Sequence, residues 1–496
     1  MYNVNVQKHY KEVITLMDII PAVRNFMSEI FLAAERFMDD PAEFCELEDR
    51  LSDIGNRTLA QIMGQILEEA DHFLQDEPGR GKKYTIERHV PKTLITTFGD
   101  VRFTRTYYKS RDTGKHHFLL DERMHLPKDE RFSELAEVKV LQEAAKSSYQ
   151  KAADTLKVGM QTVSKVSVMN KVHGILRDLP IEAPSEKRQC EYLYIEADED
   201  HIHRQKAGEE VKGECITGKL VYVFEGKEDT GDGRRKLIHT VYFGGDYAGR
   251  EANAELWRQV QSYIESHYDQ DVLKKVYLCS DGGGWIKAGL EHVDKSAAVA
   301  DRFHLMKYIN RLSRLTLDEC EHTKGRFYKY IYKNKIRKVQ RLLVDIRRSV
   351  DKQEAVDDGE TFLMNNWEAI QRAFHEKHAL GCSAEGHVSH IYSDRMSSRP
   401  MGWSSTGADR MCHLRCLTNS YGQEKIVDLV RIRRKMACEA LPATGTDGDA
   451  IGAREVIRRT YTKEQKEAAK YAELLHATLS GSLVKKELAI RARLWL

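Results

Sequence analysis

The 496-residue sequence lacks most features of secreted, membrane or zinc-binding proteins. Its nine cysteines are scattered and form no paired CxxC motifs, which argues against a structural zinc module and a disulfide framework. No window approaches the ~18–20 apolar residues needed to cross a bilayer. The N-terminus has neither the basic start nor the long apolar run of a signal peptide. We therefore expect a cytoplasmic protein.

A strong net charge is also missing. The chain has 78 Lys and Arg against 76 Asp and Glu, a net charge of +2. This balance excludes a uniformly basic protein and an acidic disordered tail. Binding to nucleic acid stays open, because local clustering decides it. Residues 302–350 carry fourteen basic and four acidic side chains, so a net charge of +10 lies in this stretch and −8 in the remainder.

The basic stretch is predicted to contact DNA. Its side chains can neutralise phosphates, and interleaved aromatic residues can stack on bases. The candidate DNA-binding residues here are Lys307, Arg311, Arg314, Lys333, Lys335, Arg337 and Lys338. The interleaved aromatics are Tyr308, Phe327, Tyr328, Tyr330 and Tyr332. A merely solvated helical face is the alternative, which the scarcity of alternating acids weakens.

Prolines number only nine, so domain boundaries are inferred from changes in pattern. Apolar spacings of three and four predict helices over 11–77, and alternating Thr, Val, Tyr and Phe with turns at Gly99 and Gly114 predict a small β module. From 191, three adjacent strands followed by alternating helix and strand give the element order of an RNase H-like α/β domain. The predicted domains are an N-terminal helical domain (1–80), a small β module (81–130), a helix-turn-helix domain (131–180), an α/β catalytic domain in two parts (190–303 and 381–425), a helical insertion between them (304–380) and a C-terminal helical region (426–496).

A helix-turn-helix is predicted over residues 147–172. Ala153 is the small residue where two helices would touch, and the core would contain Leu156, Val158, Val163 and Val166. The second helix is expected to begin near Gln161 and to present Gln161, Thr162, Ser164 and Lys165 to a DNA major groove. Lys157 occupies the turn position that favours glycine, where a left-handed conformation would cost roughly 1 kcal/mol. The alternative is an ordinary amphipathic helix pair in a larger core.

Three acidic residues stand out by their context. Asp198 ends the strand candidate EYLYIEAD, and alternation places it on the same face as Glu196. Asp281 follows the apolar strand VYLCS and precedes three glycines, and Glu385 follows the helical insertion. Converging carboxylates of this kind would hold two Mg²⁺ ions, or Mn²⁺ in their place, for phosphodiester chemistry. The alternative for each acid is a solvated surface group.

Other metal sites compete with this trio. The run from Asp198 to His203 is dense in ligands and could form a mononuclear site. Two further candidate sets use Cys and His ligands of the zinc type. They are Cys382, Glu385, His387 and His390, and the motif Cys412-His413-x-x-Cys416. None of the three has a partner pair at a familiar spacing.

Four motifs resemble the ISLre-two family of bacterial insertion-sequence transposases, within the wider group of Mutator-like DDE transposases. They are YIEADEDHIHRQ, YLCSDGGGWIKAG, DRFHLMKYI and GCSAEGHVSHIYSDRMSSRPMGWS. The resemblance covers essentially the whole chain, and the last motif is the most specific. Family members often have a Gly and a Thr-Trp pair after the first Asp, where this chain has Glu199, Asp200 and His201.

The resemblance implies a DDE triad carried by Asp198, Asp281 and Glu385, and an RNase H-like domain with a helical insertion. It also places His304 near the active site, because related transposases have a Cys- or Asp-x-x-His where this chain has Asp301 and His304. We therefore include His304 among the candidate DNA contacts. The alternative is a capped or buried histidine at a helix start.

The expected function is that of a DNA transposase of a bacterial insertion sequence. It would bind terminal inverted repeats, cleave a strand with Mg²⁺, and join the freed 3′-hydroxyl to target DNA. A homodimer or larger assembly on paired ends is expected, in the bacterial cytoplasm at the nucleoid, with no membrane and no small-molecule substrate. The rivals are an RNase H-like nuclease or resolvase without strand transfer, and a domesticated DNA-binding regulator, against which the retention of all three acids argues.

Overall fold

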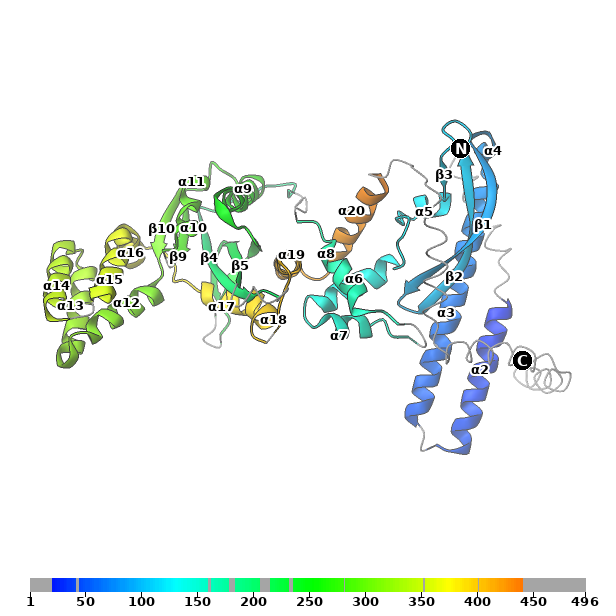
Figure 1. Cartoon of the computed structure of the whole chain (residues 1–496), viewed down its shortest axis with the longest axis horizontal. Coiled ribbons are helices and arrows are strands. Elements are labelled where there is room, and N and C mark those ends of the chain that lie inside the picture. The colour runs from blue at the N-terminus through cyan, green and yellow to red at the C-terminus, as the bar shows by residue number, and fades with distance from the viewer. Residues whose placement is uncertain are drawn as a thin grey trace. The chain divides into compact units, whose positions relative to one another are not determined.

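The chain forms two compact units in the computed structural model (Figure 1). The described residues are 20–41, 44–158, 162–177, 183–205, 215–231, 235–280, 282–350, 353–399 and 401–439. The first unit holds the described residues up to Ser133, together with Leu156–Thr162 and those from Arg434. The second holds Glu134–Thr155 and Val163–Arg433. No helix in these ranges is long and apolar enough to cross a membrane.

The first unit joins a helical hairpin to a small antiparallel sheet of order β1-β2-β3. Its elements are α2 (Ile20–Asp39), α3 (Phe44–Gln75), α4 (Arg80–Lys83), β1 (Tyr84–Thr96), β2 (Gly99–Ser110), β3 (His116–His117) and α5 (Leu119–Arg123). The expected turns lie at Gly99 and Gly114, which both have positive φ. Gly64 of α3 packs against the backbone carbonyl of Arg102 in β2, where a Cβ would not fit. The predicted helices are therefore present over 20–39 and 44–75, and the predicted hairpin is present, while residues 11–19 of the helical prediction lie outside the described residues.

The second unit is built on a five-stranded mixed sheet of order β10-β9-β4-β5-β8. Its strands are β4 (Tyr192–His203), β5 (Cys215–Phe224), β8 (Val241–Gly245), β9 (Lys275–Ser280) and β10 (Ser296–Ala300). β4, β5 and β8 form an antiparallel meander, while β9 pairs parallel with β4 and β10 pairs parallel with β9. The hairpin of β6 (Gly226–Asp229) and β7 (Arg235–Ile238) lies between β5 and β8 in the chain. The fold is thus mixed α/β.

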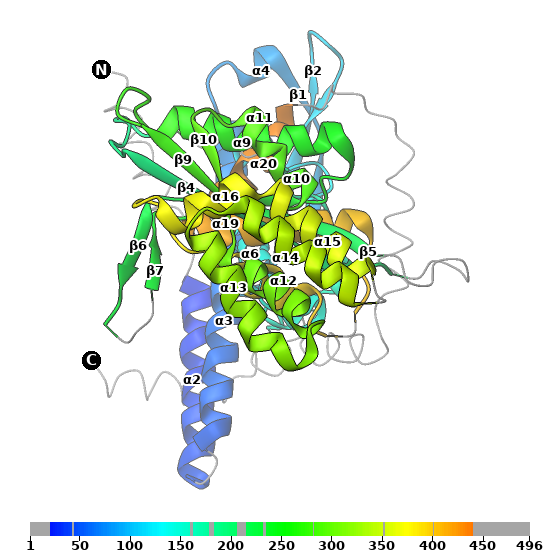
Figure 2. The same cartoon turned by 90° about the vertical axis from the view of Figure 1, so that its left-hand side faces the viewer.

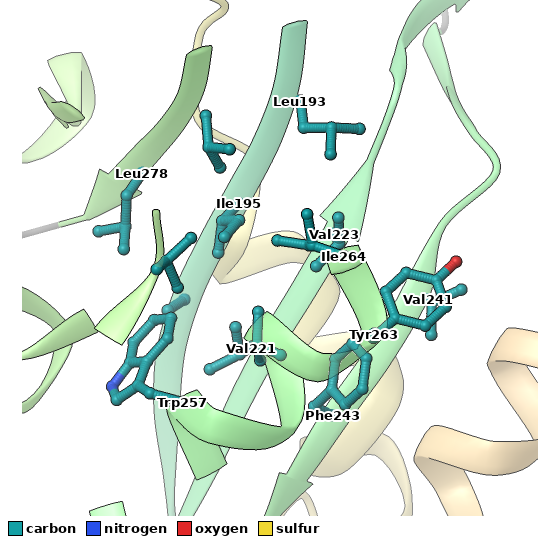
Figure 3. Packing of buried hydrophobic residues seen from close by; sticks show 14 of the residues in the cluster. Leu193, Ile195, Val221, Val223, Val241, Phe243, Trp257, Tyr263, Ile264 and Leu278 are labelled. Carbon is teal, nitrogen blue, oxygen red and sulfur yellow. The ribbon is translucent and has the colours of Figure 1, made fainter. Parts of the chain in front are cut away.

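A single apolar core lies between this sheet and helix α9 (Gly249–His267) (Figure 3). The strands contribute Leu193, Ile195, Val221, Val223 and Leu278, and α9 contributes Trp257, Val260, Tyr263 and Ile264. These side chains come from alternate strand positions and from helix positions three and four apart, as a half-buried sheet and an amphipathic helix require. The other face of β4 is polar.

A helical bundle follows β10 and contains its own core, and its helices face the viewer in Figure 2. It consists of α12 (Arg302–Arg314), α13 (Cys320–Tyr332), α14 (Ile336–Ser349), α15 (Gln353–Asn365) and α16 (Trp367–His375). The chain then returns to the sheet through α17 (Ala384–Val388), a π-helical turn (Ser389–Ser393), α18 (Asp394–Met396), α19 (Ser405–Tyr421) and α20 (Lys425–Glu439). The remainder of the predicted C-terminal helical region, from 440, lies outside the described residues.

Candidate functional site

The polar face of β4 is the centre of the candidate site. Leu193, Ile195 and Ala197 point into the core and are almost fully buried. Strand alternation sends Glu196 and Asp198 to the opposite face. The central strand therefore carries Glu196 and Asp198 on the side that α9 does not cover.

The segment that carries Glu385 runs along this polar face. His378 accepts a hydrogen bond at its carbonyl from the Tyr194 hydroxyl at 2.9 Å. The backbone N–H of Ser383 donates to Glu196 at 2.7 Å, and the Ser397 hydroxyl donates to Asp200 at 2.8 Å. Residue numbers thus rise in the same direction on both, and α17, whose first turn carries Glu385, contacts β4.

Two of the three predicted acids lie within the described residues, on two elements that contact each other, β4 and α17. Asp198 is half-buried and accepts a hydrogen bond from the backbone N–H of Glu199 at 2.8 Å. Glu385 is exposed in the first turn of α17. Asp281 lies outside the described residues. The strand that precedes it, β9, lies beside β4 with Cys279 opposite Glu196.

The competing metal sites do not form. Among the described residues, no three His, Cys, Asp or Glu side chains gather in a way that could hold a metal ion. Alternation separates Glu199, His201 and His203 from Asp198 and Asp200 on opposite faces of β4.

The two sets of Cys and His residues do not form metal sites either, because several of their side chains contact other residues. His387 hydrogen-bonds the Tyr242 hydroxyl through Nδ1 at 2.9 Å, and Cys416 is buried beside the Tyr392 hydroxyl. His413 faces Asp409 instead, with Nε2 3.5 Å from Oδ1. The imidazoles of His387 and His413 therefore each have a partner outside the expected ligand set.

Glu196 is the residue that the sequence did not single out. It is 1% exposed. Its carboxylate accepts hydrogen bonds from Tyr222, Lys227 and Ser383. A glutamate within the part of the strand that is otherwise free of charge, Tyr192–Ala197, was the available signal, because such a charge is buried only with partners.

His304 lies in the first turn of α12 and is paired with Asp301. Asp301 caps this helix by accepting the Phe303 N–H at 3.0 Å, and its Oδ2 lies 2.7 Å from Nδ1 of His304. Burial raises the pKa of Asp301, but hydrogen bonds from His304 and from the Phe303 N–H bring it below its usual value. His304 therefore has the local geometry of a histidine at a capped helix start, which is the alternative given by the sequence.

Three helices occupy the predicted helix-turn-helix region, and they contact one another. They are α6 (Glu134–Ala144), α7 (Tyr149–Asp154) and α8 (Lys165–His173). Ala153 is buried as expected. Ten residues separate α7 from α8, more than the three or four of a tight helix-turn-helix.

The start of the second helix differs from the prediction. α8 begins at Lys165, not near Gln161, because the Ser164 hydroxyl caps it by accepting the Ser167 N–H at 3.0 Å. Val166 is consequently 51% exposed, so its predicted place in the core is wrong, and Val168 and Val172 are buried instead. Thr162, Ser164 and Lys165 are exposed as expected, and Gln161 lies outside the described residues.

The turn between α13 and α14 is the most basic described surface of the insertion. Lys333, Lys335, Arg337 and Lys338 are exposed here, and within the described ranges none of them forms an ion pair. A hydrogen bond from Arg326, together with the charges of Lys338 and Lys329, lowers the pKa of nearby Tyr330. A local excess of positive charge therefore exists at this turn.

Other predicted DNA contacts in the insertion are partly occupied. Lys307 and Arg314 are exposed, but Arg311 pairs with Asp358 of α15 at 3.0 Å. The aromatic prediction is wrong for Phe327, which is fully buried. Tyr308 stacks on Phe362 at 4.1 Å between ring centroids, while Tyr332 is 60% exposed. Helical periodicity explains this, since Phe327 and Ile331 share the face that packs on the bundle core.

The sequence of the chain matches a described protein family. Residues 37–432 match the Uncharacterised protein family (UPF0236), so the chain is a member of that family. A UPF0236 protein of Caldanaerobacter subterraneus subsp. tengcongensis, whose name joins eleven locus designations, is 31% identical over 426 residues. The match covers 85% of this chain and 87% of that relative. Another from the same bacterium, with four locus designations, is 30% identical over 426 residues and covers 85% and 87%.

A solved structure is also similar in part. A chain of the Drosophila P element transposase strand transfer complex matches over 67% of this chain and 88% of its own length. The identity is 10% and the TM-score is 0.20, which is too low to carry a conclusion about fold or function.

Proposed function

We propose that this protein is a DNA transposase whose α/β domain is RNase H-like. The main observation in its support is an acidic residue, Asp198, on the central strand of the five-stranded sheet. The order of the strands in this sheet is the one expected of an RNase H-like fold. Numbered along the chain, the strands of the sheet lie in the order five, four, one, two, three, with the first three antiparallel and the last two parallel. Asp198 lies on the first strand, beside the segment that leads to Glu385.

Under this proposal, Asp281 would lie beside Asp198. In the register of β4 with β9, Glu196 lies opposite Cys279, and the two aspartates each follow two residues later in the sequence. Asp198, Asp281 and Glu385 offer carboxylate oxygens, the ligands that Mg²⁺ prefers. Two such ions would stabilise the attacking and leaving oxygens of an in-line displacement at phosphorus. The same three side chains could then serve both strand cleavage and strand transfer.

The DNA would be held by surfaces outside the sheet. The basic turn between α13 and α14 offers cations without acidic partners, which is what phosphate binding requires. The exposed Thr162, Ser164 and Lys165 at the start of α8 offer further donors. We assign the terminal inverted repeats to the region up to about residue 180 and the phosphate contacts to the insertion.

The relatives support a mobile element. One relative's name joins eleven locus designations of a single bacterium, and another's joins four. A sequence that occurs at many places in one genome is typical of an insertion sequence that copies or moves itself. Together with the resemblance of the motifs, this favours a transposase over a single-copy regulator.

The decisive experiment is a nicking and joining assay on DNA that carries the element's inverted repeats. Asp198→Asn and Asp281→Asn should each abolish Mg²⁺-dependent nicking and leave binding to the repeats nearly intact, because they remove metal ligands and not DNA contacts. The exposed Asp271, changed to Asn, serves as the matched control and should nick like the wild type. Undiminished nicking by either variant would contradict the triad.

The same assay separates the rival functions. A pre-nicked substrate with a free 3′-hydroxyl yields a joined product only with a transposase. Cleavage without joining would indicate a nuclease or resolvase. Binding without either reaction in the wild-type protein would indicate a DNA-binding regulator.

A further inference from the structure

Glu196 is a buried carboxylate whose charge is fully partnered. Oε1 accepts a hydrogen bond from the Lys227 ammonium at 3.1 Å. Oε2 accepts hydrogen bonds from the Ser383 N–H at 2.7 Å and from the Ser383 hydroxyl at 3.0 Å. The Tyr222 hydroxyl also donates to Oε2. Burial and the charge of Glu196 raise the pKa of Tyr222, so that hydroxyl stays protonated and donates. A carboxylate with its oxygens occupied in this way has little capacity left for a metal ion or substrate.

The partners of Glu196 come from three places in the chain. Tyr222 lies on β5 and Lys227 on β6, while Ser383 lies just before α17. Lys227 also donates to the carbonyl of Gly381 and lies 3.3 Å from the Ser383 hydroxyl. Glu196 therefore fastens residues 381–383 to the middle of the sheet, two residues before Glu385.

A pair of thiols lies at the same junction. Cys279 of β9 lies opposite Glu196 in the register, and the Cys382 thiol lies close to that of Cys279. This contact and burial raise the pKa of the Cys382 thiol. Because the thiolate is the reactive form, Cys382 should react slowly with alkylating reagents as long as residues 381–383 stay in place. Its reactivity therefore reports attachment of this segment.

We propose that Glu196 is a positioning residue, which holds residues 381–383 on β4 and thereby places Glu385 beside Asp198. Its catalytic consequence rests on the proposed function, whereas the attachment itself does not. Partners that orient metal ligands commonly change metal affinity or activity by 10–100-fold when they are removed. Glu196→Gln keeps the size of the side chain but turns an acceptor into an NH₂ donor toward Lys227 or Ser383.

The first test measures attachment without any assay of function. The full-length wild type, Glu196→Gln and Glu225→Gln are treated with N-ethylmaleimide, and labelling of Cys382 is followed by peptide mass spectrometry. Glu225 is a matched control, because it also accepts hydrogen bonds from a tyrosine and basic side chains, namely Tyr268, Arg188 and His239. Labelling should be about tenfold faster in Glu196→Gln, through local opening, and unchanged in Glu225→Gln. Equal rates in all three proteins would overturn the attachment.

The second test measures nicking against Mg²⁺ concentration. Glu196→Gln should raise the concentration for half-maximal nicking about tenfold, with binding to the inverted repeats unchanged. A purely structural role would lower the active fraction without moving the Mg²⁺ dependence, and that result would refute positioning.

A milder variant covers the case in which Glu196→Gln does not fold. Ser383→Ala removes one of the hydrogen bonds to Glu196 and should shift both readouts in the same direction by about threefold, close to the 0.5–1.5 kcal/mol of one hydrogen bond. No shift in either readout would also refute the proposal. A wild type that never nicks DNA would refute the proposed function alone, since the labelling test decides the attachment independently.

Discussion

At the scale of residues, the environment of each acid separates the roles of Glu196 and Asp198. The two share one strand face and lie two positions apart, about 7 Å along the strand. Glu196 accepts hydrogen bonds from donors on β5, β6 and the segment before α17, whereas Asp198 is half-buried. Under the proposed function, Asp198 would bind the metal ion and Glu196 would hold the geometry behind it.

Asp301 gives a prediction for pH and stability. Its pKa is lower in the folded chain than its usual value, so its contribution is present above the unfolded pKa of about 4 and is lost as pH falls through the folded pKa. Asp301→Ala should lower the free energy of unfolding by about 1 kcal/mol at pH 7, through loss of the cap of α12. Urea denaturation at pH 7 and pH 3 measures this difference, which should shrink at the lower pH. The exposed Asp345, changed to Ala, should show no such difference, and a constant difference for Asp301→Ala would contradict the assignment.

At the scale of elements, helix ends and helix faces decide which charges are available. α15 carries acids that pair with Arg311 and with Arg347, which lies 2.7 Å from Asp357. Within the described residues, no ion pair forms at Lys333 or Lys335 of the turn between α13 and α14. The charge of this turn therefore stays available to phosphates, because paired bases release fewer counterions from DNA.

Charge removal at this turn should weaken DNA binding in a salt-dependent way. The double variant Lys333→Ala, Lys335→Ala should make the negative slope of log affinity against log salt shallower by about 2, if each lysine neutralises one phosphate. Arg347→Ala is the control, since its charge is already paired with Asp357 and Glu360. Fluorescence anisotropy with labelled duplex DNA across a salt series gives the slopes. Equal slopes for the double variant and the wild type would exclude this turn from the interface.

A second element-scale feature joins the three-helix module to the sheet. Arg415 of α19 donates to the carbonyls of Ala145 and Ile391, and Arg395 donates to the carbonyl of Ala144. The carbonyls of Ala144 and Ala145 lie at the C-terminal end of α6, where backbone acceptors have no partner within the helix. Two buried arginines thus fix α6 to the part of the chain that follows Glu385.

At the scale of the whole molecule, α3 has apolar side chains on two opposite faces. Ile54 and Ala60 are buried, whereas Leu59 and Ile66 are exposed. The exposed apolar residues of this hairpin are Val23, Met27, Phe31, Leu32, Met38, Phe44, Leu51, Leu59 and Ile66. They offer roughly 800 Å² of surface, about what one partner buries in a standard interface. We propose that a second copy of this chain covers them, which the proposed function would need for the pairing of two transposon ends.

The mass of the assembly in solution tests this surface. Leu59→Lys combined with Ile66→Lys should convert a dimer or larger assembly into a monomer, because a buried lysine needs a partner that an apolar interface lacks. Ile86→Lys, at a similarly exposed position on β1, should leave the mass unchanged. Size-exclusion chromatography with light scattering gives the masses. A wild type with the mass of one chain would refute the interface.

The sequence by itself determined the elements and two of the acids. Alternation of side chains put Asp198 and Glu196 on one face of a strand, and helical spacing found the insertion, because both patterns act within a few residues. Local signals were less able to fix helix starts, as the shift of α8 to Lys165 shows.

Only the tertiary structure decided which polar groups meet. Glu196 and Ser383 are 187 residues apart in the chain, and no local pattern links them. The same holds for Phe327, whose burial depends on the bundle around it and not on the basic residues beside it in sequence. Periodicity states which face a side chain occupies, but packing between distant segments decides whether that face meets solvent, a core or a partner.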